Sequence, residues 1–366
     1  MSDASQAGPY DIGAEPQRSD FCSAAPGVQP VNALHTDVSA PWASIVMPVR
    51  KCRETVAKSL DALCRQKVPA RCEIILVCDR HDDDSLEIIR NHPLAAKWDF
   101  VEIFHPGRGT AMACNLGWNA ARAPYIFNMH TDCYPVDDDA MTRMVGWLER
   151  EGAVAVQPLV DIPQGDWATM SLWDRVSSSQ FRYAKPSNNL MGKFDLIRRS
   201  ALEKVGGYDD FHFFSAADDA DMVERLSAIG KIASSDVVVI HAHQHPLESR
   251  FTGSLRKHTQ SGEGFGALLR KYWRAPAFLH RAWVIIALNL LKLALLVGCF
   301  IPPVTIYALL LMLLLSAYYA RWALLSRDWR VVLVPFAVSV MFALFAIAMV
   351  YGFFRGRQSF DYIKAG

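Results

Sequence analysis

The sequence predicts an α/β domain built on a mostly parallel sheet, followed by membrane helices near the C-terminus. The first observation is a regular alternation. Between residues 42 and 245, short apolar runs rich in Val and Ile take turns with segments of helical period. The second observation is a set of three long, almost uncharged apolar runs after residue 281. Alternation of this kind is typical of a parallel sheet flanked by helices, and runs of this length are typical of membrane-spanning segments.

The alternation gives the expected elements in chain order. Strands are expected at 43–49, 72–79, 100–105, 124–130 and 237–246. Helices are expected at 54–66, after a cap at Asp83 or Asp84, at 110–121, at 198–205 and from 218 onward. The pair Gly206-Gly207 ends the fourth of these helices. In sheets of this class ligands bind at the carboxyl ends of the strands, so residues at those ends are candidate site residues.

The composition excludes a nucleic-acid partner and a disulfide framework. The 38 Lys and Arg residues are balanced by 37 Asp and Glu residues, which leaves no global charge to drive nucleic-acid binding. The eight cysteines form no CxxC pair, and several lie inside apolar runs, which predicts reduced thiols in a cytosolic compartment. Residues 1–41 are polar and carry no secretory signal, so we expect a disordered leader there.

The three apolar runs lie at 282–301, 304–320 and 331–354. A helix needs about 20 residues to cross a hydrocarbon core of about 30 Å, so the first and third runs are long enough and the second is barely so. Buried core helices are the alternative, and the first run could lie in the interface with Lys292 reaching the headgroups. We expect two to three transmembrane helices within 282–354 and a polar tail at 355–366.

Basic residues flank these runs and predict their orientation. A basic amphipathic juxtamembrane segment, 266–281, precedes the first run, and three arginines follow the second run within 321–330. The positive-inside rule then places the soluble domain in the cytoplasm. A third crossing would leave Arg355, Arg357 and Lys364 outside, which fits this rule less well. The number of crossings therefore stays open between two and three.

Acidic residues stand at two kinds of position that suit a binding site. Asp79 and Asp132 each end an expected strand, where the alternative is helix capping. Asp218, Asp219 and Asp221 open an expected helix, where the macrodipole alone would favour acids. Three acids in four residues exceed what capping requires, and adjacent carboxylates raise one another's pKa, which suits a proton acceptor.

Three histidines follow the last expected strand, and alternation puts His241, His243 and His245 on one face. Zinc binding is one interpretation, but no Cys or acid stands at ligand spacing. A solvated strand end is another, and one imidazole completing a carboxylate and diphosphate site is a third. The basic amphipathic stretch 249–273 could contact anionic lipid headgroups or the phosphates of an acceptor.

Together these segments resemble the family 2 inverting glycosyltransferases, whose nucleotide-sugar-binding fold is called GT-A. The resemblance lies in "SIVMPVRKCRETVAKSLDALCRQ", "IILVCDRHDDDS", "GRGTAMACNLGWNAARAPYIFNMHTDCYP", "AADDADMVERLSAIG" and "VIHAHQHPLESR". It spans about residues 43–265 and implies a GT-A domain at 42–265. Two positions depart from the family pattern: Lys51 replaces the usual Asn, and His130 replaces the first acid of the D-x-D motif.

The resemblance also implies roles for single residues. Asp219 matches the catalytic base, and Asp218 matches the acid before it. Asp132 matches the last acid of the D-x-D motif, which holds a divalent metal, Mg²⁺ or Mn²⁺, with His243 as a further ligand. The implied donor-binding residues are Pro48, Asp79, Arg108, Asn115, His130 and Asp132. The implied contacts to acceptor or phosphate are Asn189, Asp221 and Arg256.

The implied function is that of a membrane-anchored inverting glycosyltransferase. It would move a sugar from a nucleotide-diphosphate donor, with UDP-sugars favoured, to a lipid-linked acceptor in cell-envelope or exopolysaccharide assembly. The expected location is the bacterial inner membrane, with the catalytic domain in the cytoplasm. A polyprenyl-phosphate glycosyltransferase and a non-catalytic scaffold in a polysaccharide assembly complex are the alternatives. A processive synthase is disfavoured because the Q-x-x-R-W motif is absent after the acids.

Overall fold

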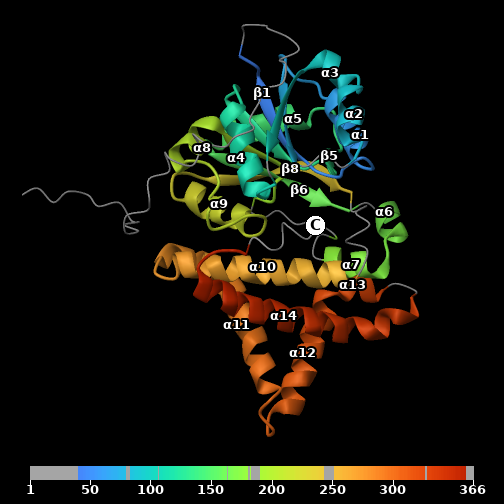
Figure 1. Cartoon of the computed structure of the whole chain (residues 1–366), viewed down its shortest axis with the longest axis vertical. Coiled ribbons are helices and arrows are strands. Elements are labelled where there is room, and N and C mark those ends of the chain that lie inside the picture. The colour runs from blue at the N-terminus through green and yellow to red at the C-terminus, as the bar shows by residue number, and fades with distance from the viewer. Residues whose placement is uncertain are drawn as a thin grey trace, which may run out of the picture.

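The computed structural model describes residues 40–79, 83–105, 107–162, 164–179, 182, 190–242, 251–325 and 328–359. A single sheet of eight strands forms the centre of the upper part of the molecule (Figure 1). Its strand order is β3-β2-β1-β4-β7-β6-β8-β5. The strands are β1 (Ala43–Val49), β2 (Glu73–Asp79), β3 (Asp99–His105), β4 (Tyr125–Met129), β5 (Cys133–Pro135), β6 (Ala155–Asp161), β7 (Lys193–Arg198) and β8 (Ile232–His241).

The sheet is parallel on one side and mixed on the other. The strands β3, β2, β1 and β4 pair in parallel, and β6 pairs in parallel with β8. The strand β7 is antiparallel to both β4 and β6, and β5 is antiparallel to β8. The strand β2 is buried at every position, as expected for a strand covered on both faces. The predicted α/β class with a mostly parallel sheet is therefore confirmed.

Helices cover both faces of this sheet. One face packs against α1 (Val56–Cys64), α2 (Ser85–Arg90), α3 (Leu94–Lys97) and α5 (Ala140–Arg150). The other face packs against α4 (Thr110–Ala120), α8 (Arg199–Val205) and α9 (Asp218–Ser227). The closest approach is at Gly117 of α4, where an added Cβ would lie 2.2 Å from a methyl carbon of Val46. Only a glycine lets α4 lie this close to β1.

Two short helices lead from the sheet toward the C-terminal part. These are α6 (Gln164–Thr169) and α7 (Leu172–Ser178), which follow β6. The helix α7 begins with a regular cap, because the Ser171 hydroxyl accepts a hydrogen bond from the Asp174 backbone N–H. The strands β5, β6 and β7 were not among the predicted elements; β7 in particular is a buried six-residue run that the sequence interrupts with Lys193 and Asp195.

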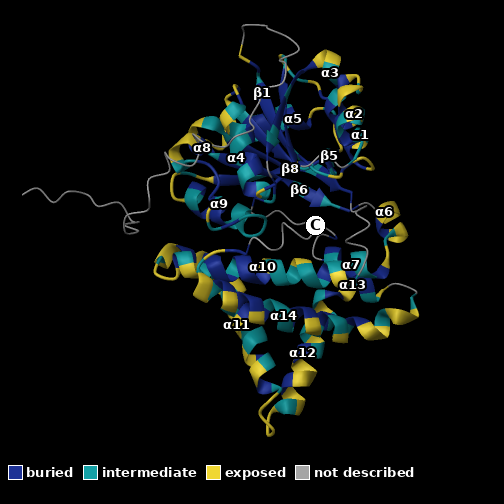
Figure 2. Ribbon diagram, in the orientation of Figure 1, coloured by how far each residue is buried: buried dark blue, intermediate teal, exposed yellow. Residues whose placement is uncertain are grey.

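The C-terminal part consists of long helices beneath the sheet domain (Figure 1). They are α10 (Phe251–Tyr272), α11 (Pro276–Gly298), α12 (Thr305–Tyr319), α13 (Arg321–Leu324), a 3-10 helix (Trp329–Leu333) and α14 (Val334–Arg355). Helices α10 and α14 run across the molecule one below the other, whereas α11 and α12 run downward as a hairpin. Exposed residues dominate the surface of this hairpin, in contrast to the buried sheet (Figure 2).

Two helical segments of the described chain are long and apolar enough to span a bilayer by length and composition, Pro276–Gly298 and Trp329–Arg355. Helix α12, with 15 residues, is shorter. The large apolar side chains that stay exposed cluster on α11, α12 and α14 rather than on the sheet domain. An apolar surface of this size is typical of a membrane-associated protein.

Candidate active site

The turn between β4 and β5 places Asp132 at the edge of the sheet. Three hydrogen bonds fix the backbone of this turn, residues 130–133. The Cys133 N–H donates to the His130 carbonyl (3.2 Å), the Ala242 N–H donates to the Asp132 carbonyl (2.8 Å), and the Ser59 hydroxyl donates to the Thr131 carbonyl (2.8 Å). The backbone that carries Asp132 is therefore fixed by Ser59 of α1 on one side and by Ala242, directly after β8, on the other.

Asp132 meets an imidazole from the end of β8. His241 Nε2 lies 3.1 Å from Asp132 Oδ2, and the pairing of β5 with β8 brings the two side chains together. Burial acts to raise the pKa of Asp132, but His241, His130 and Lys193 together lower this pKa below its usual range. The result is an ionised carboxylate at the strand end, as a cation-binding residue needs to be.

Donor atoms of Asp132, Cys133 and His241 all lie within 4.8 Å of one another. The carboxylate and the imidazole suit Mg²⁺ or Mn²⁺, and the remaining positions would go to phosphate oxygens and water. The Cys133 thiol is less suited, because burial raises its pKa well above the ordinary value and keeps it protonated. The residues present thus fit a divalent metal held by Asp132 and His241.

His130, which stands where the family has an acid, lies against Gly192. An added Cβ on Gly192 would come 2.9 Å from His130 Nε2, and the φ of this glycine is +66°. Burial lowers the pKa of His130, and the neighbouring Asp132 charge opposes this shift. A neutral imidazole can donate or accept a hydrogen bond, which suits a ribose or diphosphate contact as well as a metal ligand.

The first turn of α9 presents Asp218 and Asp219. The Asp219 carboxylate accepts a hydrogen bond from the Ala220 N–H at 2.7 Å. Burial, and then the neighbouring Asp219 charge, raise the pKa of Asp218 to about 7, and burial also raises the pKa of Asp219. Two neighbouring carboxyl groups with raised pKa values form a proton-accepting pair suited to work near neutral pH.

Lys193 and Asp195 of β7 lie between these two groups of residues, and sequence reasoning did not select either. Lys193 is buried, and its ammonium interacts electrostatically with both Asp132 and Asp219. Asp195 accepts hydrogen bonds from the N–H groups of Met191 and Gly192, and burial raises its pKa to about 7. The sequence does contain a pattern that could have indicated these two residues, because a Lys and an Asp interrupt an apolar run directly after Gly192.

Backbone strain marks the same region. Among the described residues, the non-glycine residues with positive φ are Lys51 (45°), Phe194 (78°) and Ala217 (66°). Phe194 lies between Lys193 and Asp195, and Ala217 directly precedes Asp218. Conformations of this kind cost of order 1–3 kcal/mol each and concentrate at functional sites. Lys51 lies just beyond the end of β1, three residues after Pro48, so all three strained residues are close in sequence to candidate site residues.

At the far end of the site, Asp79 ends β2 beside Arg50 and Gly107. Arg50 Nε lies 3.7 Å from Asp79 Oδ2. Gly107 has a φ of +72°, and an added Cβ there would come 2.6 Å from Asp79 Oδ1, so only glycine fits. Pro48, at the end of the neighbouring strand β1, is half-buried. This carboxylate is therefore presented at the carboxyl end of the parallel half of the sheet.

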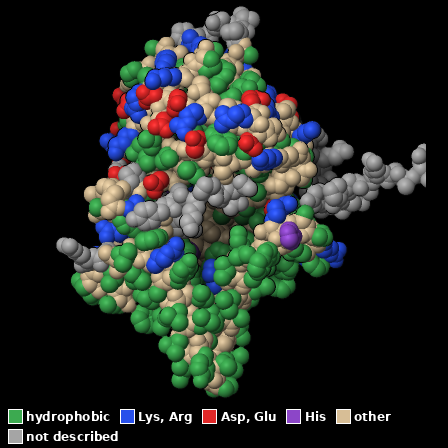
Figure 3. Space-filling model, turned by 180° about the vertical axis from the view of Figure 1, so that it is seen from behind, with side chains coloured by type: hydrophobic (Ala, Val, Ile, Leu, Met, Phe, Trp, Pro, Cys, Tyr) green, Lys and Arg blue, Asp and Glu red, His purple; other side chains and the backbone are tan. Residues whose placement is uncertain are grey.

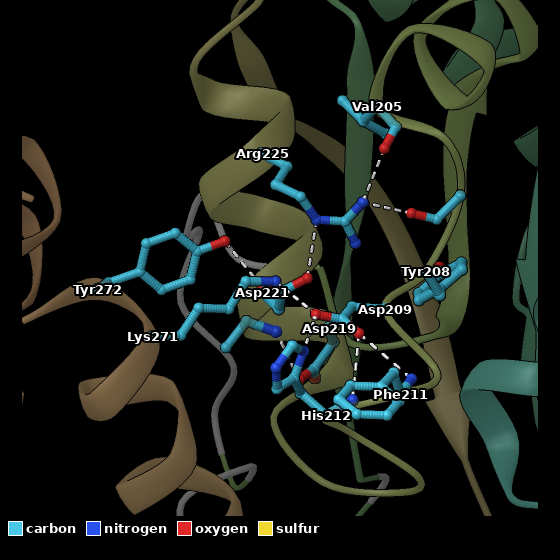
Figure 4. Close-up of polar contacts among 12 residues, drawn as sticks. Val205, Tyr208, Asp209, Phe211, His212, Asp219, Asp221, Arg225, Lys271 and Tyr272 are labelled. Atoms are coloured by element: carbon cyan, nitrogen blue, oxygen red, sulfur yellow. Dashed lines mark hydrogen bonds and ion pairs between the residues drawn. The ribbon is translucent and has the colours of Figure 1, made fainter. Parts of the chain in front are cut away.

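Two predicted contact residues have structural partners instead. Asn115 links α4 to the loop before α9, because its amide donates to the Tyr208 carbonyl and to Asp210 Oδ2 and accepts from the Tyr208 N–H. Asp221 is fully buried, and Figure 4 shows its carboxylate among basic and hydroxyl groups. We therefore assign both residues to the support of the site rather than to contact with donor or acceptor.

The Asp221 cluster joins α9 to α10 (Figure 4). Asp221 Oδ2 accepts from Arg225 Nε (2.8 Å), and Asp221 Oδ1 accepts from Lys271 Nζ and from the Tyr272 hydroxyl (both 2.8 Å). Lys271 also pairs with Asp209, whose carboxylate contacts His212 Nδ1 at 2.7 Å. The helix that carries Asp219 is thus tied to the first helix of the C-terminal part.

An Asp221→Asn substitution is expected to lower the free energy of unfolding by about 3 kcal/mol, because it leaves the Arg225 and Lys271 charges buried with one counter-charge fewer. Denaturation followed by intrinsic fluorescence in detergent measures this loss. Glu203→Gln is the matched control: it removes the exposed pair of Arg199 and Glu203, and we expect a change below about 0.5 kcal/mol. Equal effects of the two substitutions would contradict the structural role of Asp221.

Four predicted site residues remain, of which two have no contact described above and two lie outside the residues that the structure describes. Arg108 is exposed just before α4, and Arg256 is half-buried in α10. His243 and Asn189 lie outside the residues that the structure describes, so their predicted roles stay predictions.

Comparisons with known proteins agree with this geometry. The model of the family "Glycosyl transferase family 2" matches residues 44–206, from β1 to the end of α8. The poly-beta-1,6-N-acetyl-D-glucosamine synthase of Staphylococcus epidermidis is 29% identical over 167 residues, which cover 43% of this chain and 39% of the synthase. The N-acetylglucosaminyl-diphospho-decaprenol L-rhamnosyltransferase of Mycobacterium tuberculosis is 30% identical over 117 residues, covering 31% of this chain and 36% of that enzyme. The chain thus spans well under half the length of these relatives.

Among solved structures, the mannosyltransferase PcManGT from Pyrobaculum calidifontis, in complex with GDP-Man and Mn²⁺, superimposes with a TM-score of 0.55 at 18% identity. The match covers 87% of this chain and 88% of that one, and it supports the predicted GT-A fold. The mostly parallel sheet agrees with the family match, which identifies a domain of the glycosyl transferase family 2 type over residues 44–206, somewhat less than half of the chain.

Proposed function

We propose that this chain is a membrane-anchored inverting glycosyltransferase that moves a sugar from a nucleotide-diphosphate donor to a lipid-linked acceptor in envelope or exopolysaccharide assembly. One observation carries the proposal. The proton-accepting pair Asp218 and Asp219 and the cation-binding pair Asp132 and His241 share Lys193 as an electrostatic neighbour. A base on one side and a diphosphate-binding group on the other side of a sugar are what inversion requires.

Each residue has a part in the proposed reaction. Asp219 takes the proton from the acceptor hydroxyl, whose oxygen bonds to the anomeric carbon as the bond to the diphosphate oxygen breaks. A Mg²⁺ or Mn²⁺ ion on Asp132 and His241 would neutralise charge on the departing diphosphate. Lys193 is placed to attract the same charge, and Asp79 is placed to hold the nucleoside. Asp218 shares the proton of the pair and so sets the pKa of the base.

The acceptor class is inferred from the helices below the site. Gln358, just after α14, accepts hydrogen bonds from the N–H groups of Phe214 and Ser215, in the loop that leads to Asp219. The apolar helices therefore lie directly behind the proposed base. A cavity of about 1130 Å³ also opens between α6–α7 and the membrane-side helices. Among the side chains that line it are Trp167, Arg175, Arg182, Trp322, Trp329 and Arg330. Arginine and tryptophan at such a boundary suit a phosphate-bearing lipid.

The function is tested by incubating membranes that contain the chain with a panel of UDP-, GDP- and dTDP-sugars and Mn²⁺. We expect nucleoside diphosphate release with one donor class, increased by an added polyprenyl-diphosphate sugar acceptor. UDP-sugars are the favoured class, and a polyprenyl phosphate serves as the second acceptor in the panel. A wild-type chain that releases diphosphate from no donor would support the non-catalytic scaffold instead.

The transfer rate is expected to fall tenfold for each unit of pH below about 7. The sign follows from the raised pKa of Asp218, about 7, and of Asp219: a base must be ionised, and below pH 7 the pair holds an extra proton. Initial rates at saturating donor between pH 5.5 and 8.5 measure this dependence. A rate that stays flat down to pH 5.5 would show that the base has an ordinary pKa and that this pair is not the base.

A further inference from the structure

Helix α14 begins and ends on the side of the sheet domain. At its start, the preceding 3-10 helix contributes Trp329 and Arg330 to a cavity that also contains Arg175 of α7. At its end, the Gln358 N–H donates to the His212 carbonyl (2.8 Å), and its side-chain oxygen binds the loop before α9. A helix whose two ends both contact the water-exposed domain cannot cross a bilayer, although its length and composition would allow it.

Close packing against α10 holds α14 in this position. An added Cβ would lie 2.4 Å from the Phe345 carbonyl oxygen at Gly262, 2.0 Å from the Met349 carbonyl oxygen at Gly266, and 2.1 Å from the Glu263 carbonyl oxygen at Gly352. Backbones approach this closely only where both helices present small residues. Helix α10 carries Arg256, Lys257, Arg270 and Lys271, so it belongs at the water interface, and α14 lies beside it there.

The face of α14 opposite to α10 is apolar and exposed, so this is the face that would contact the hydrocarbon core of the membrane. The exposed residues of this face are Phe336, Val340, Ile347, Tyr351 and Phe354. The hairpin of α11 and α12 projects beyond α14 on that side (Figure 1), and seen from behind its surface is almost entirely hydrophobic (Figure 3).

The hairpin is too short to cross. The Ser316 hydroxyl of α12 lies 2.9 Å from the Ser339 hydroxyl of α14, so the level of α14 is reached at Ser316. From there to the start of α12 at Thr305 are 11 residues (316 − 305), or about 17 Å at 1.5 Å per residue. The hydrocarbon core is about 30 Å thick. The hairpin therefore ends near the middle of the bilayer.

The tip of the hairpin has the composition of a buried segment. Residues 299–304 read CFIPPV, and no charged residue occurs from 293 to 320. Phe300 at the tip is 81% exposed in the chain alone. A loop that emerged into water on the far side would be expected to carry polar or charged side chains, whereas these residues suit hydrocarbon. The nearest basic residues are Lys292 of α11, whose ammonium lies over the Phe342 ring at the level of α14, and Arg321 after the end of α12.

We propose that the chain is bound to one leaflet only: α14 lies in the plane of the interface, and the α11–α12 hairpin enters the hydrocarbon and returns without reaching the other side. The inference rests on the membrane association proposed above, but not on the glycosyl transfer. It replaces the expected two or three crossings by none, and it leaves both ends of the described chain on the side of the catalytic domain. An acceptor would then be drawn from the same leaflet.

Cysteine labelling in sealed vesicles of phosphatidylethanolamine and phosphatidylglycerol tests the proposal. Phe300→Cys and, at a second tip position, Tyr307→Cys are made in a background with Cys22→Ser, Cys64→Ser and Cys299→Ser, which spares the buried cysteines. A membrane-impermeant maleimide is supplied outside in one arm and trapped inside in the other. We expect less than a tenth of either tip cysteine to react in both arms, and nearly all of it to react after detergent is added.

Lys204→Cys, exposed on α8, is the control for orientation and should react from outside only. Reaction of the tip cysteines with the trapped reagent would overturn the proposal, since the tip would then reach the far side. Protection that persists in detergent would also overturn it, because a second protein chain rather than lipid would cover the tip. A chain recovered wholly in the soluble fraction would overturn both this inference and the membrane association, while leaving donor turnover as a separate measurement.

Discussion

Replacing Asp219 by Asn is expected to lower the transfer rate about 1000-fold while leaving donor binding intact. The amide keeps the size and most hydrogen bonds of the carboxylate, including the bond from the Ala220 N–H, but it cannot take a proton. A positioned general base contributes roughly 10²–10⁴-fold to a rate, and the raised pKa of this carboxyl group suits the role at neutral pH. Initial rates of diphosphate release with acceptor present measure the loss.

The control for this substitution is Asp61→Asn, which changes an exposed carboxylate of α1 that contacts only His92 among the described residues. We expect unchanged transfer in that variant. Titration calorimetry with the nucleoside diphosphate should give Kd values within about twofold for both variants and the wild type. If Asp219→Asn transfers at the wild-type rate and Asp218→Asn does not, the two acids have been assigned in the wrong order.

The second large effect is expected at Asp132. Asp132→Asn should weaken Mn²⁺ binding and lower transfer at least 100-fold, because it removes the charge that faces the cation and leaves His241 as the other described ligand. Metal-bound fractions measured by Mn²⁺ electron paramagnetic resonance separate this loss from a loss of folding. The transfer rate should recover in part at high Mn²⁺, which a loss of the base could not produce.

Asp137→Asn is the matched control, because Asp137 is an exposed acid five residues further along that pairs with Arg143. It should bind Mn²⁺ and transfer sugar as the wild type does. Unaltered Mn²⁺ binding in Asp132→Asn would contradict the assignment of the metal site. His241→Gln tests the second ligand, and we expect a smaller loss there, about 10- to 100-fold, because an amide oxygen can still coordinate the ion.

The parallel half of the fold could be predicted from local patterns because apolar residues dominate each of its strands and segments of helical period separate them. The strands β1 to β4 lie within one or two residues of the predicted ranges, and α9 begins at the predicted Asp218. The mixed half was harder to predict. Strand β7 contains Lys193 and Asp195, which break the apolar run, and β5 has three residues. Long-range pairing, which a local pattern does not reveal, gives these segments their strand conformation.

The candidate site was predicted in part for the same reason. Acids at strand ends can be found from the sequence, which is how Asp79 and Asp132 were selected. Partners that depend on tertiary contacts cannot be found in this way. Asp221 reads as one of three equivalent acids, yet in an α-helix it points about 200° away from Asp219, toward Lys271 and Tyr272 of α10. Asn115 likewise takes its role from Tyr208 and Asp210, 93 and 95 residues away, and Lys193 takes its role from its interactions with Asp132 and Asp219.

The membrane segment shows how composition and placement can differ. The run at 331–354 has the length and hydropathy of a membrane-spanning helix. Its backbone packs closely against the glycines of α10, and Gln358 just after it hydrogen-bonds the loop before α9, which is why we propose that it lies along the interface. Hydropathy measures the tendency of a segment to leave water, and tertiary contacts then decide whether it lies across the bilayer or along it.

In the proposed reaction the diphosphate of the donor binds beside Asp132 and the acceptor hydroxyl meets Asp219. A crystal structure with Mn²⁺ and an intact nucleotide-sugar donor, recorded at the manganese absorption edge, tests it most directly. We expect an anomalous peak within about 2.5 Å of Asp132 and His241, with the anomeric carbon between that peak and the Asp219 carboxylate. A manganese peak or a diphosphate remote from Asp132, or an anomeric carbon turned away from Asp219, would contradict it.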